Sequence, residues 1–102
     1  MCKKVIIIGS GIAGLASAIR LSNYGYSVIV FESNTDVGGK ISEINKNGYR
    51  FDTGPSLFTM PELMDELVKI GYKNANKKFD YKEIDITCSY FFDDGVVLNA
   101  YS

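Results

Sequence analysis

The chain has 102 residues, of which 46% are hydrophobic and 23% charged, a composition typical of a globular protein and not of a disordered one. Its formal net charge of −1 provides no positive field that would attract nucleic acid, so we expect no nucleic-acid partner. Histidine is absent, which excludes histidine-based catalytic triads and histidine-containing metal sites, and we expect no metal. The length suffices for one modest domain with a packed core.

Two cysteines and one apolar stretch indicate the cellular compartment in which the protein is expected to lie. Cys2 and Cys88 are too far apart for a Cys-x-x-Cys pair, which fits a reducing, cytoplasmic setting. Residues 5–19 follow two lysines and contain Ala16-Ser17-Ala18, as in a signal peptide, but cleavage there would discard a glycine loop that continues in register with the residues after it. No run approaches the roughly 18 apolar residues of a membrane span, so we expect a protein that does not cross a membrane.

The first third of the chain predicts a strand, a helix and a second strand. Residues 5–8 are a β-branched run ended by glycine, which is typical of a strand buried on both faces in a parallel sheet. Apolar residues then recur at helical spacing from Gly11 to about Tyr24, and Gly25 stands where a left-handed helix cap is wanted. Residues 27–31 form the second strand. The pattern is a βαβ unit of an α/β, Rossmann-like fold.

The remainder predicts two hairpins separated by one helix. Asn47-Gly48 supplies positive φ angles between strands at residues 41–44 and 49–51. Thr59 and Glu62 form a capping box for a helix over residues 61–70, which Gly71 terminates. The lysines of residues 73–78 are expected to be solvated, with a lipid-headgroup contact as the alternative. A second hairpin follows over residues 81–98. No closing helix follows it, so we expect an N-terminal fragment of a larger domain.

The segment from Gly9 to Gly14 fits Gly-x-Gly-x-x-Gly between the first strand and the first helix. Gly9 allows a tight turn, Gly11 allows close approach of a pyrophosphate, and Gly14 allows the helix to pack against the strand. The free amides of Ile12 and Ala13, at the positive end of the helix, suit a diphosphate. In this context the motif predicts binding of an adenine dinucleotide, although a glycine-rich turn that binds nothing has the same pattern.

Glu32 follows the second strand, 21 residues after Gly11, where a carboxylate accepts hydrogen bonds from the adenosine ribose. A carboxylate repels a 2′-phosphate, so NADP is disfavoured. The alternative is an exposed glutamate at a strand end. The glycine pair in Asp36-Val37-Gly38-Gly39-Lys40 lets the backbone approach a second part of an extended dinucleotide, which favours FAD over NAD.

A further motif is the run from Gly48 to Ser56, which reads Gly-Tyr-Arg-Phe-Asp-Thr-Gly-Pro-Ser. Together with Glu32 and Gly38-Gly39-Lys40, this run resembles the carotenoid (phytoene) desaturase and isomerase group of flavin amine-oxidase-like enzymes. Lys40 stands where arginine is common in the wider group; it keeps the charge but loses the bidentate fork. Apart from the resemblance, Asp52 could cap the amide of Gly54 in an Asx-type turn that Pro55 stiffens.

The resemblance implies an FAD-dependent oxidoreductase that removes hydrogen from a long hydrophobic polyene such as phytoene, with peripheral membrane association. It implies that Gly54, Pro55 and Ser56 lie close to the cofactor, and that the substrate pocket lies in later sequence, so the chain alone is expected to be inactive. Residues 1–56 would form the FAD-binding segment, and residues 57–102 would lead to a substrate domain. A non-catalytic dinucleotide-binding module, an amine oxidase and a retinol-saturase-like protein remain alternatives. The candidate cofactor-binding residues are Gly9, Ser10, Gly11, Ile12, Ala13, Gly14, Glu32, Ser33, Gly39, Lys40, Gly54, Pro55 and Ser56; no catalytic residue is assigned.

Overall fold

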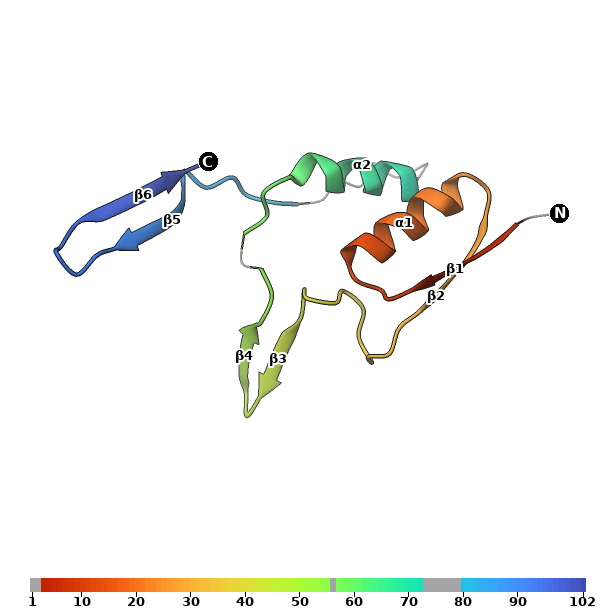
Figure 1. Ribbon diagram of the computed structural model, residues 1–102, viewed down its shortest axis with the longest axis horizontal. Helices are drawn as coiled ribbons and strands as arrows, with labels where there is room; N and C mark the ends of the chain where they lie inside the picture. The colour runs from red at the N-terminus through yellow and green to blue at the C-terminus, as the bar shows by residue number, and fades with distance from the viewer. Residues whose placement is uncertain (1–2, 56, 73–79) are drawn as a thin grey trace.

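A computed structural model describes residues 3–55, 57–72 and 80–102. The elements in chain order are β1 (Lys4–Ile8), α1 (Ile12–Asn23), β2 (Ser27–Phe31), β3 (Glu43–Lys46), β4 (Tyr49–Asp52), α2 (Pro61–Gly71), β5 (Ile86–Phe91) and β6 (Val97–Tyr101). They form one parallel strand pair and two antiparallel hairpins, with α2 packed beside α1 and the β5–β6 hairpin at the far end (Figure 1). The mixed α/β, Rossmann-like fold predicted from the sequence is confirmed.

The βαβ unit forms as its residues predict. β1 and β2 pair in parallel with Ile6 opposite Ile29, and the amide of Gly9 extends the ladder with a hydrogen bond of 2.7 Å to the carbonyl of Phe31. Gly25 has a φ of 86° and donates its amide to the carbonyl of Ser22, so it ends α1 in the left-handed conformation that was expected. The short connections keep the two strand ends and the first turn of α1 together.

The strand pair is covered on one face only, which corrects the expectation of burial on both. Val5, Ile7 and their partners in β2 are partly buried and α1 contacts both strands, whereas Ile6 is 61% and Ile8 89% exposed. β-Branched runs form strands whether or not both faces find cover, because the preference comes from side-chain shape as well as burial. The run therefore predicted the strand but not its surroundings.

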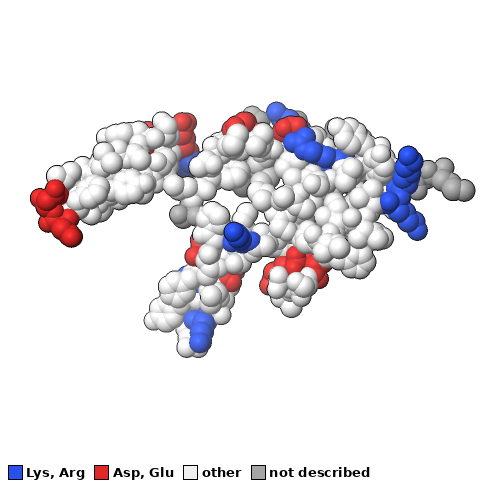
Figure 2. Space-filling model, viewed as in Figure 1, with Lys and Arg blue, Asp and Glu red and all other residues white. Residues whose placement is uncertain are grey.

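The expectation of a packed core is also wrong for the described residues. Leu67 is the only hydrophobic side chain among them that is buried, and the radius of gyration is 18.3 Å, with extents of 66 × 33 × 24 Å. A compact domain of this length has a radius of gyration of about 13 Å. The strand pair and the two hairpins thus make no contact with one another and share no common interior (Figure 1). Much of the face that Figure 2 shows is uncharged.

Both hairpins turn at the glycine-containing positions that the sequence predicts. Asn47 and Gly48 have φ angles of 52° and 82°, and Lys46 pairs with Tyr49 across a two-residue turn. In the second hairpin Gly95 has a φ of 83°, and the turn beside it carries the acidic side chains that cover the hairpin tip in Figure 2. The β5–β6 pair begins only at Ile86, later than the alternation of apolar residues indicates.

The start of α2 differs from its prediction. Met60 is the N-cap residue and no side chain caps the helix, so the capping box of Thr59 and Glu62 is wrong, although Pro61 does occupy the first turn. Gly71 is the last helical residue and not a left-handed terminator; the amide of Tyr72 closes the helix on the carbonyl of Val68 at 2.9 Å. The expected lysine loop at residues 73–78 lies outside the described residues. Among those that are described, the longest helix has 12 residues, too short to cross a bilayer.

Candidate functional site

The glycine loop between β1 and α1 has the backbone geometry that its motif requires. Gly9 has a φ of 96°, which provides the tight turn. A Cβ atom on Gly14 would lie 2.1 Å from the carbonyl oxygen of Gly9, so α1 can approach the strand end only because residue 14 has no side chain. A Cβ on Gly11 would meet nothing within 4 Å, so the position faces open space. The tight turn predicted at Gly9 and the close packing of helix on strand predicted at Gly14 are confirmed.

The N-terminus of α1 presents amides to that open space. Gly11 is the N-cap residue and its side chain can offer no cap; the structure has no side-chain hydrogen bond there and no acidic residue in the first turn. The first amides of a helix have no intrahelical partner, so Ile12 and Ala13 are free of helix bonds and lie at the positive end of the dipole. This end of α1 is suited to an anion.

Ser10 ties the glycine loop to the end of β2. It is the most buried residue described, 1% exposed. Its amide donates a hydrogen bond of 2.8 Å to Oε2 of Glu32, and its hydroxyl donates one of 2.7 Å to the same oxygen. Both donors of Ser10 are therefore used within the protein. Its carbonyl accepts a third hydrogen bond, from the amide of Gly38 at 2.9 Å.

The other oxygen of the Glu32 carboxylate faces the surface. Oε1 accepts hydrogen bonds from the amides of Ser33 at 2.8 Å and Asn34 at 2.9 Å, and from their side chains at 3.3 and 2.9 Å. The hydrogen bonds to the two oxygens, that from the amide of Ser10 foremost, lower the pKa of the Glu32 carboxyl to about 2. Glu32 is thus a carboxylate across the whole physiological pH range.

The glycine pair at residues 38 and 39 packs on the first glycine loop. Gly38 and Gly11 form a parallel bridge, and a Cβ on Gly39 would lie 3.0 Å from the Cα of Gly11. Both glycines have positive φ angles, 120° and 63°. A side chain on Gly39 would force the two loops apart, and a Cβ on Gly38 would lie 2.7 Å from the carbonyl oxygen of Ile41. The pair therefore lets the chain after β2 lie directly beside the start of α1.

The resembling segment from Phe51 to Pro55 runs back against the residues that follow the glycine pair. A Cβ on Gly54 would lie 2.2 Å from the carbonyl oxygen of Lys40, and the amide of Thr53 donates to the carbonyl of Ser42 at 2.9 Å. Within the described residues the Asp52 carboxylate is bonded to Arg50 at 2.7 Å, and no bond to the Gly54 amide is found there. The Asx-type turn is therefore not formed.

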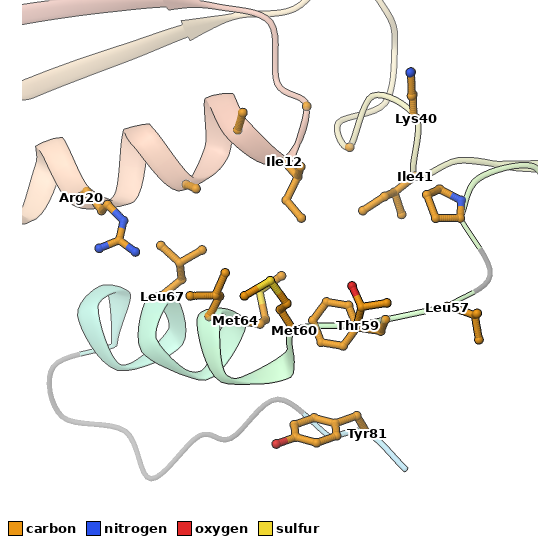
Figure 3. Close-up of a pocket in the computed structure, with 17 residues that line it drawn as sticks. Ile12, Arg20, Lys40, Ile41, Leu57, Thr59, Met60, Met64, Leu67 and Tyr81 are labelled. Carbon is orange, nitrogen blue, oxygen red and sulfur yellow. The ribbon is translucent and has the colours of Figure 1, made fainter. Parts of the chain in front are cut away.

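These segments and α2 line an open cavity of about 1080 Å³. Figure 3 shows Ile12 and Ile41 pointing into the space from above, with Met64 and Leu67 of α2 opposite, while Lys40 points away from α2. The lining is mainly apolar and comprises Gly11, Ile12, Ala13, Ala16, Arg20, Gly38, Lys40, Ile41, Pro55, Leu57, Phe58, Thr59, Met60, Leu63, Met64, Leu67 and Tyr81.

Five of the predicted site residues line this cavity: Gly11, Ile12, Ala13, Lys40 and Pro55. The other described site residues do not line this cavity. Ser56 lies outside the described residues. Sequence reasoning missed the apolar face of α2, although the spacing of Leu63, Met64 and Leu67 along one side of a helix was a usable signal.

A second, more polar cavity of about 680 Å³ lies beyond the glycine pair, on the side of the loop after Glu32. Its lining comprises Asn34, Thr35, Asp36, Val37, Gly39, Ile41, Ser42, Glu43 and Asn45. Gly39 lines this cavity and Gly38 lines the apolar one, so the glycine pair forms the wall between them.

Comparison with known families supports the interpretation of this loop geometry. Residues 7–69 match the family described as NAD(P)-binding Rossmann-like domain, which is more than half of the chain. The chain belongs to that family. The matched range contains the glycine loop, Glu32, the glycine pair and α2 as far as Lys69, so the Rossmann-like domain includes the whole apolar cavity except Tyr81.

Two curated relatives of this Rossmann-like domain are carotenoid enzymes. The chain is 52% identical over 98 residues to a 1-hydroxycarotenoid 3,4-desaturase of a Flavobacterium species, covering 96% of this chain and 20% of that protein. It is 37% identical over 101 residues to a 4,4′-diaponeurosporene oxygenase of Staphylococcus aureus, covering 99% of this chain and 20% of that protein. The chain thus spans about a fifth of the length of these relatives, and its similarity to the carotenoid desaturase group is confirmed.

Among solved structures, an oxidoreductase from Methanosarcina mazei matches with a TM-score of 0.47 and 38% sequence identity, over 52% of this chain and 13% of that one.

Proposed function

We propose that this chain is the FAD-binding segment of an oxidoreductase that dehydrogenates a long hydrophobic polyene. The observation that carries the proposal is the contact between the two glycine segments: the pair at residues 38–39 packs on Gly11, beside a mainly apolar cavity. Membership of the Rossmann-like family supports a dinucleotide cofactor. The carotenoid relatives support a polyene substrate. The chain's own residues fit the adenine half of such a cofactor.

The diphosphate would lie at the N-terminus of α1. There the amides of Ile12 and Ala13 have no helix partner, and the absent side chain of Gly11 leaves room for close approach. Glu32 would accept hydrogen bonds from the ribose hydroxyls through Oε1, with Ser33 beside it. Its charge, fixed by the lowered pKa, opposes a 2′-phosphate, which favours FAD or NAD over NADP.

FAD is favoured over NAD because the second glycine segment and the cavity provide for the rest of an extended molecule. Gly39, Lys40, Gly54 and Pro55 lie in sequence segments that contact one another beside Gly11, and we propose that they line the path of the cofactor. The apolar wall of Ile41 and the α2 face suits a flat, weakly polar ring.

When bound, FAD would supply the hydride acceptor for C–H removal, so the chemistry belongs to the cofactor. The chain's contribution is to hold the adenine half and to provide the apolar wall beside it. The two relatives are named for carotenoid substrates, which are long apolar molecules; a polyene of this kind is the proposed substrate of the complete enzyme, with peripheral contact to the membrane that dissolves it. No residue of this chain is assigned to catalysis.

The test is direct. The chain is mixed with FAD and freed of unbound cofactor, and the absorption spectrum of the protein is recorded; retained flavin absorption supports the proposal. Calorimetric titration with ADP and with 2′-phospho-ADP then measures the discrimination by Glu32. We expect ADP to bind more tightly, and Glu32→Arg to reverse the order. Colourless protein that binds neither nucleotide would favour a module without cofactor, and a tight 2′-phospho-ADP complex would contradict the role of Glu32.

A substrate test separates the desaturase from an amine oxidase or a retinol-saturase-like enzyme. It measures flavin reduction in the full-length gene product, without oxygen, after addition of a carotenoid, an amine or a retinoid. Reduction by the carotenoid alone is expected. Reduction by the amine or the retinoid alone would contradict the proposed polyene substrate, whereas the proposed FAD binding would still hold.

A further inference from the structure

We infer that Ser10 is a positioning residue, which orients the carboxylate of Glu32 for ribose recognition and makes no contact with the cofactor itself. The inference rests on the proposed nucleotide binding. From its place in the glycine motif, Ser10 was expected to contact the cofactor; here it is assigned to hold Glu32 instead. It also divides the Glu32 carboxylate into one oxygen used for structure and one for the ligand.

The hydrogen bonds of Ser10 leave it nothing to offer a phosphate. Its amide and its hydroxyl both donate to Oε2 of Glu32, at 2.8 and 2.7 Å, and its carbonyl accepts from Gly38. A serine side chain has one hydroxyl proton to donate, and in Ser10 this proton is used in the hydrogen bond to Glu32. With 1% of the residue exposed, Ser10 is also closed to solvent, so a ligand outside the loop cannot reach it without rearranging the loop.

The two oxygens of Glu32 differ in which residues donate to them. Two donors on a buried residue hold Oε2. Oε1 accepts four hydrogen bonds, from the amides and side chains of Ser33 and Asn34, and a ribose hydroxyl can displace the two side-chain donors because they are exposed. A carboxylate with one oxygen fixed cannot rotate about its Cγ–Cδ bond without losing both charge-assisted hydrogen bonds. Oε1 is therefore presented at a constant position beside the loop that begins α1, which is the geometry that simultaneous contact with a ribose and a diphosphate requires.

The experiment compares Ser10→Ala with Ser89→Ala. The control removes a hydroxyl that also donates at 2.7 Å, to Asn99 on the distant β5–β6 hairpin. Calorimetry measures the affinity of each protein for ADP and for inorganic pyrophosphate, which lacks the ribose. NMR measures the pKa of the Glu32 carboxyl without ligand, because Ser10→Ala should raise it from about 2 toward its ordinary value. That readout reports the contact itself.

We expect Ser10→Ala to weaken ADP binding by roughly tenfold, the usual effect of losing a hydrogen bond to a charged group, and to leave pyrophosphate binding within about twofold. Ser89→Ala should change neither. An equal loss for both ligands would overturn the inference, because the hydroxyl would then serve the diphosphate or the loop as a whole. A raised Glu32 pKa with unchanged ADP affinity would overturn it as well.

Failure of the proposed function is recognisable separately. If the unchanged protein binds neither ADP nor pyrophosphate, nucleotide binding itself is refuted, and the positioning role with it. That result appears before any substitution is made, whereas failure of the Ser10 role alone appears only as a difference between variant and unchanged protein.

Discussion

The carbonyl oxygen of Gly9 occupies the place that a side chain on Gly14 would need, 2.1 Å from the position of its Cβ. Ordinary carbon–oxygen contacts are longer than 3 Å, and a backbone carbonyl cannot move aside as a flexible side chain can. The first turn of α1 and the end of β1 are therefore held at a separation that only glycine permits.

Gly14→Ala should accordingly destabilise the chain by about 1–3 kcal/mol, the usual cost of inserting a methyl group into close-packed structure. We expect the loop to be displaced as well, so that ADP affinity falls together with the free energy of unfolding in urea. The matched control is Ser17→Ala, which introduces the same side chain at an exposed position of the same helix. A Gly14→Ala variant as stable as the unchanged chain would show that α1 can shift away from Gly9 at no cost.

Gly11→Val should separate binding from stability. A Cβ there meets no atom within 4 Å, and the backbone at φ −65° and ψ 173° is extended, which a β-branched residue adopts readily. The fold should be retained, while the added methyl groups fill the space proposed for the diphosphate and abolish ADP binding. Circular dichroism and calorimetry together measure this. Normal ADP affinity in the variant would mean that the nucleotide lies elsewhere.

Stability should depend on pH through Glu32. Its carboxyl has a folded-state pKa of about 2, below the ordinary value of 4.5, so its hydrogen bonds stabilise the fold fully above pH 4.5 and the stabilisation is lost as the pH falls toward 2. We expect the melting temperature of the unchanged chain to fall over this window more than that of Glu32→Gln, which carries no charge to lose. Parallel curves for the two proteins would contradict the hydrogen-bonding pattern.

Asn34→Ala should strengthen ADP binding. The side-chain amide of Asn34 donates to Oε1 of Glu32 at 2.9 Å from an exposed position, so it competes with the ribose hydroxyl for the same oxygen. Removing this competitor should raise ADP affinity a few-fold, as expected for one exposed hydrogen bond, and leave pyrophosphate affinity unchanged. Asn45→Ala, which removes a side-chain amide bonded to Glu43 at 2.7 Å, is the control. Weaker ADP binding in Asn34→Ala would instead make Asn34 a ligand contact.

Leu67→Ala should be the more damaging of two leucine truncations on α2. Leu67 is 9% exposed at the contact with α1, whereas Leu63 on the same helix is 45% exposed. Removing the buried side chain should cost about 2 kcal/mol, the lower end for leucine, because the surrounding core is small. Urea unfolding compares it with Leu63→Ala, for which a smaller loss is expected. Equal losses would indicate that α2 does not pack on α1 through Leu67.

Much of the local structure could be predicted because it depends on neighbouring residues. The strand at residues 27–31 has the predicted bounds, and the turn at Asn47-Gly48 has the predicted positive φ angles. The capping box failed although its residues are present, since a capping hydrogen bond also requires the chain to enter the helix in the right direction. That direction is set by the contacts of the preceding segment, which no local pattern contains.

The sequence by itself determined that a glycine loop joins a strand to a helix and that an acidic residue follows the next strand, because backbone freedom and β-branched side chains act over a few residues. Only the tertiary structure decided what these residues touch. Ser10 is bonded to Glu32, 22 residues away, and Gly39 lies against Gly11. Such pairings depend on how separate segments pack. For the same reason, only the structure shows that Ser10 holds Glu32 and that the apolar face of α2 lines the cavity.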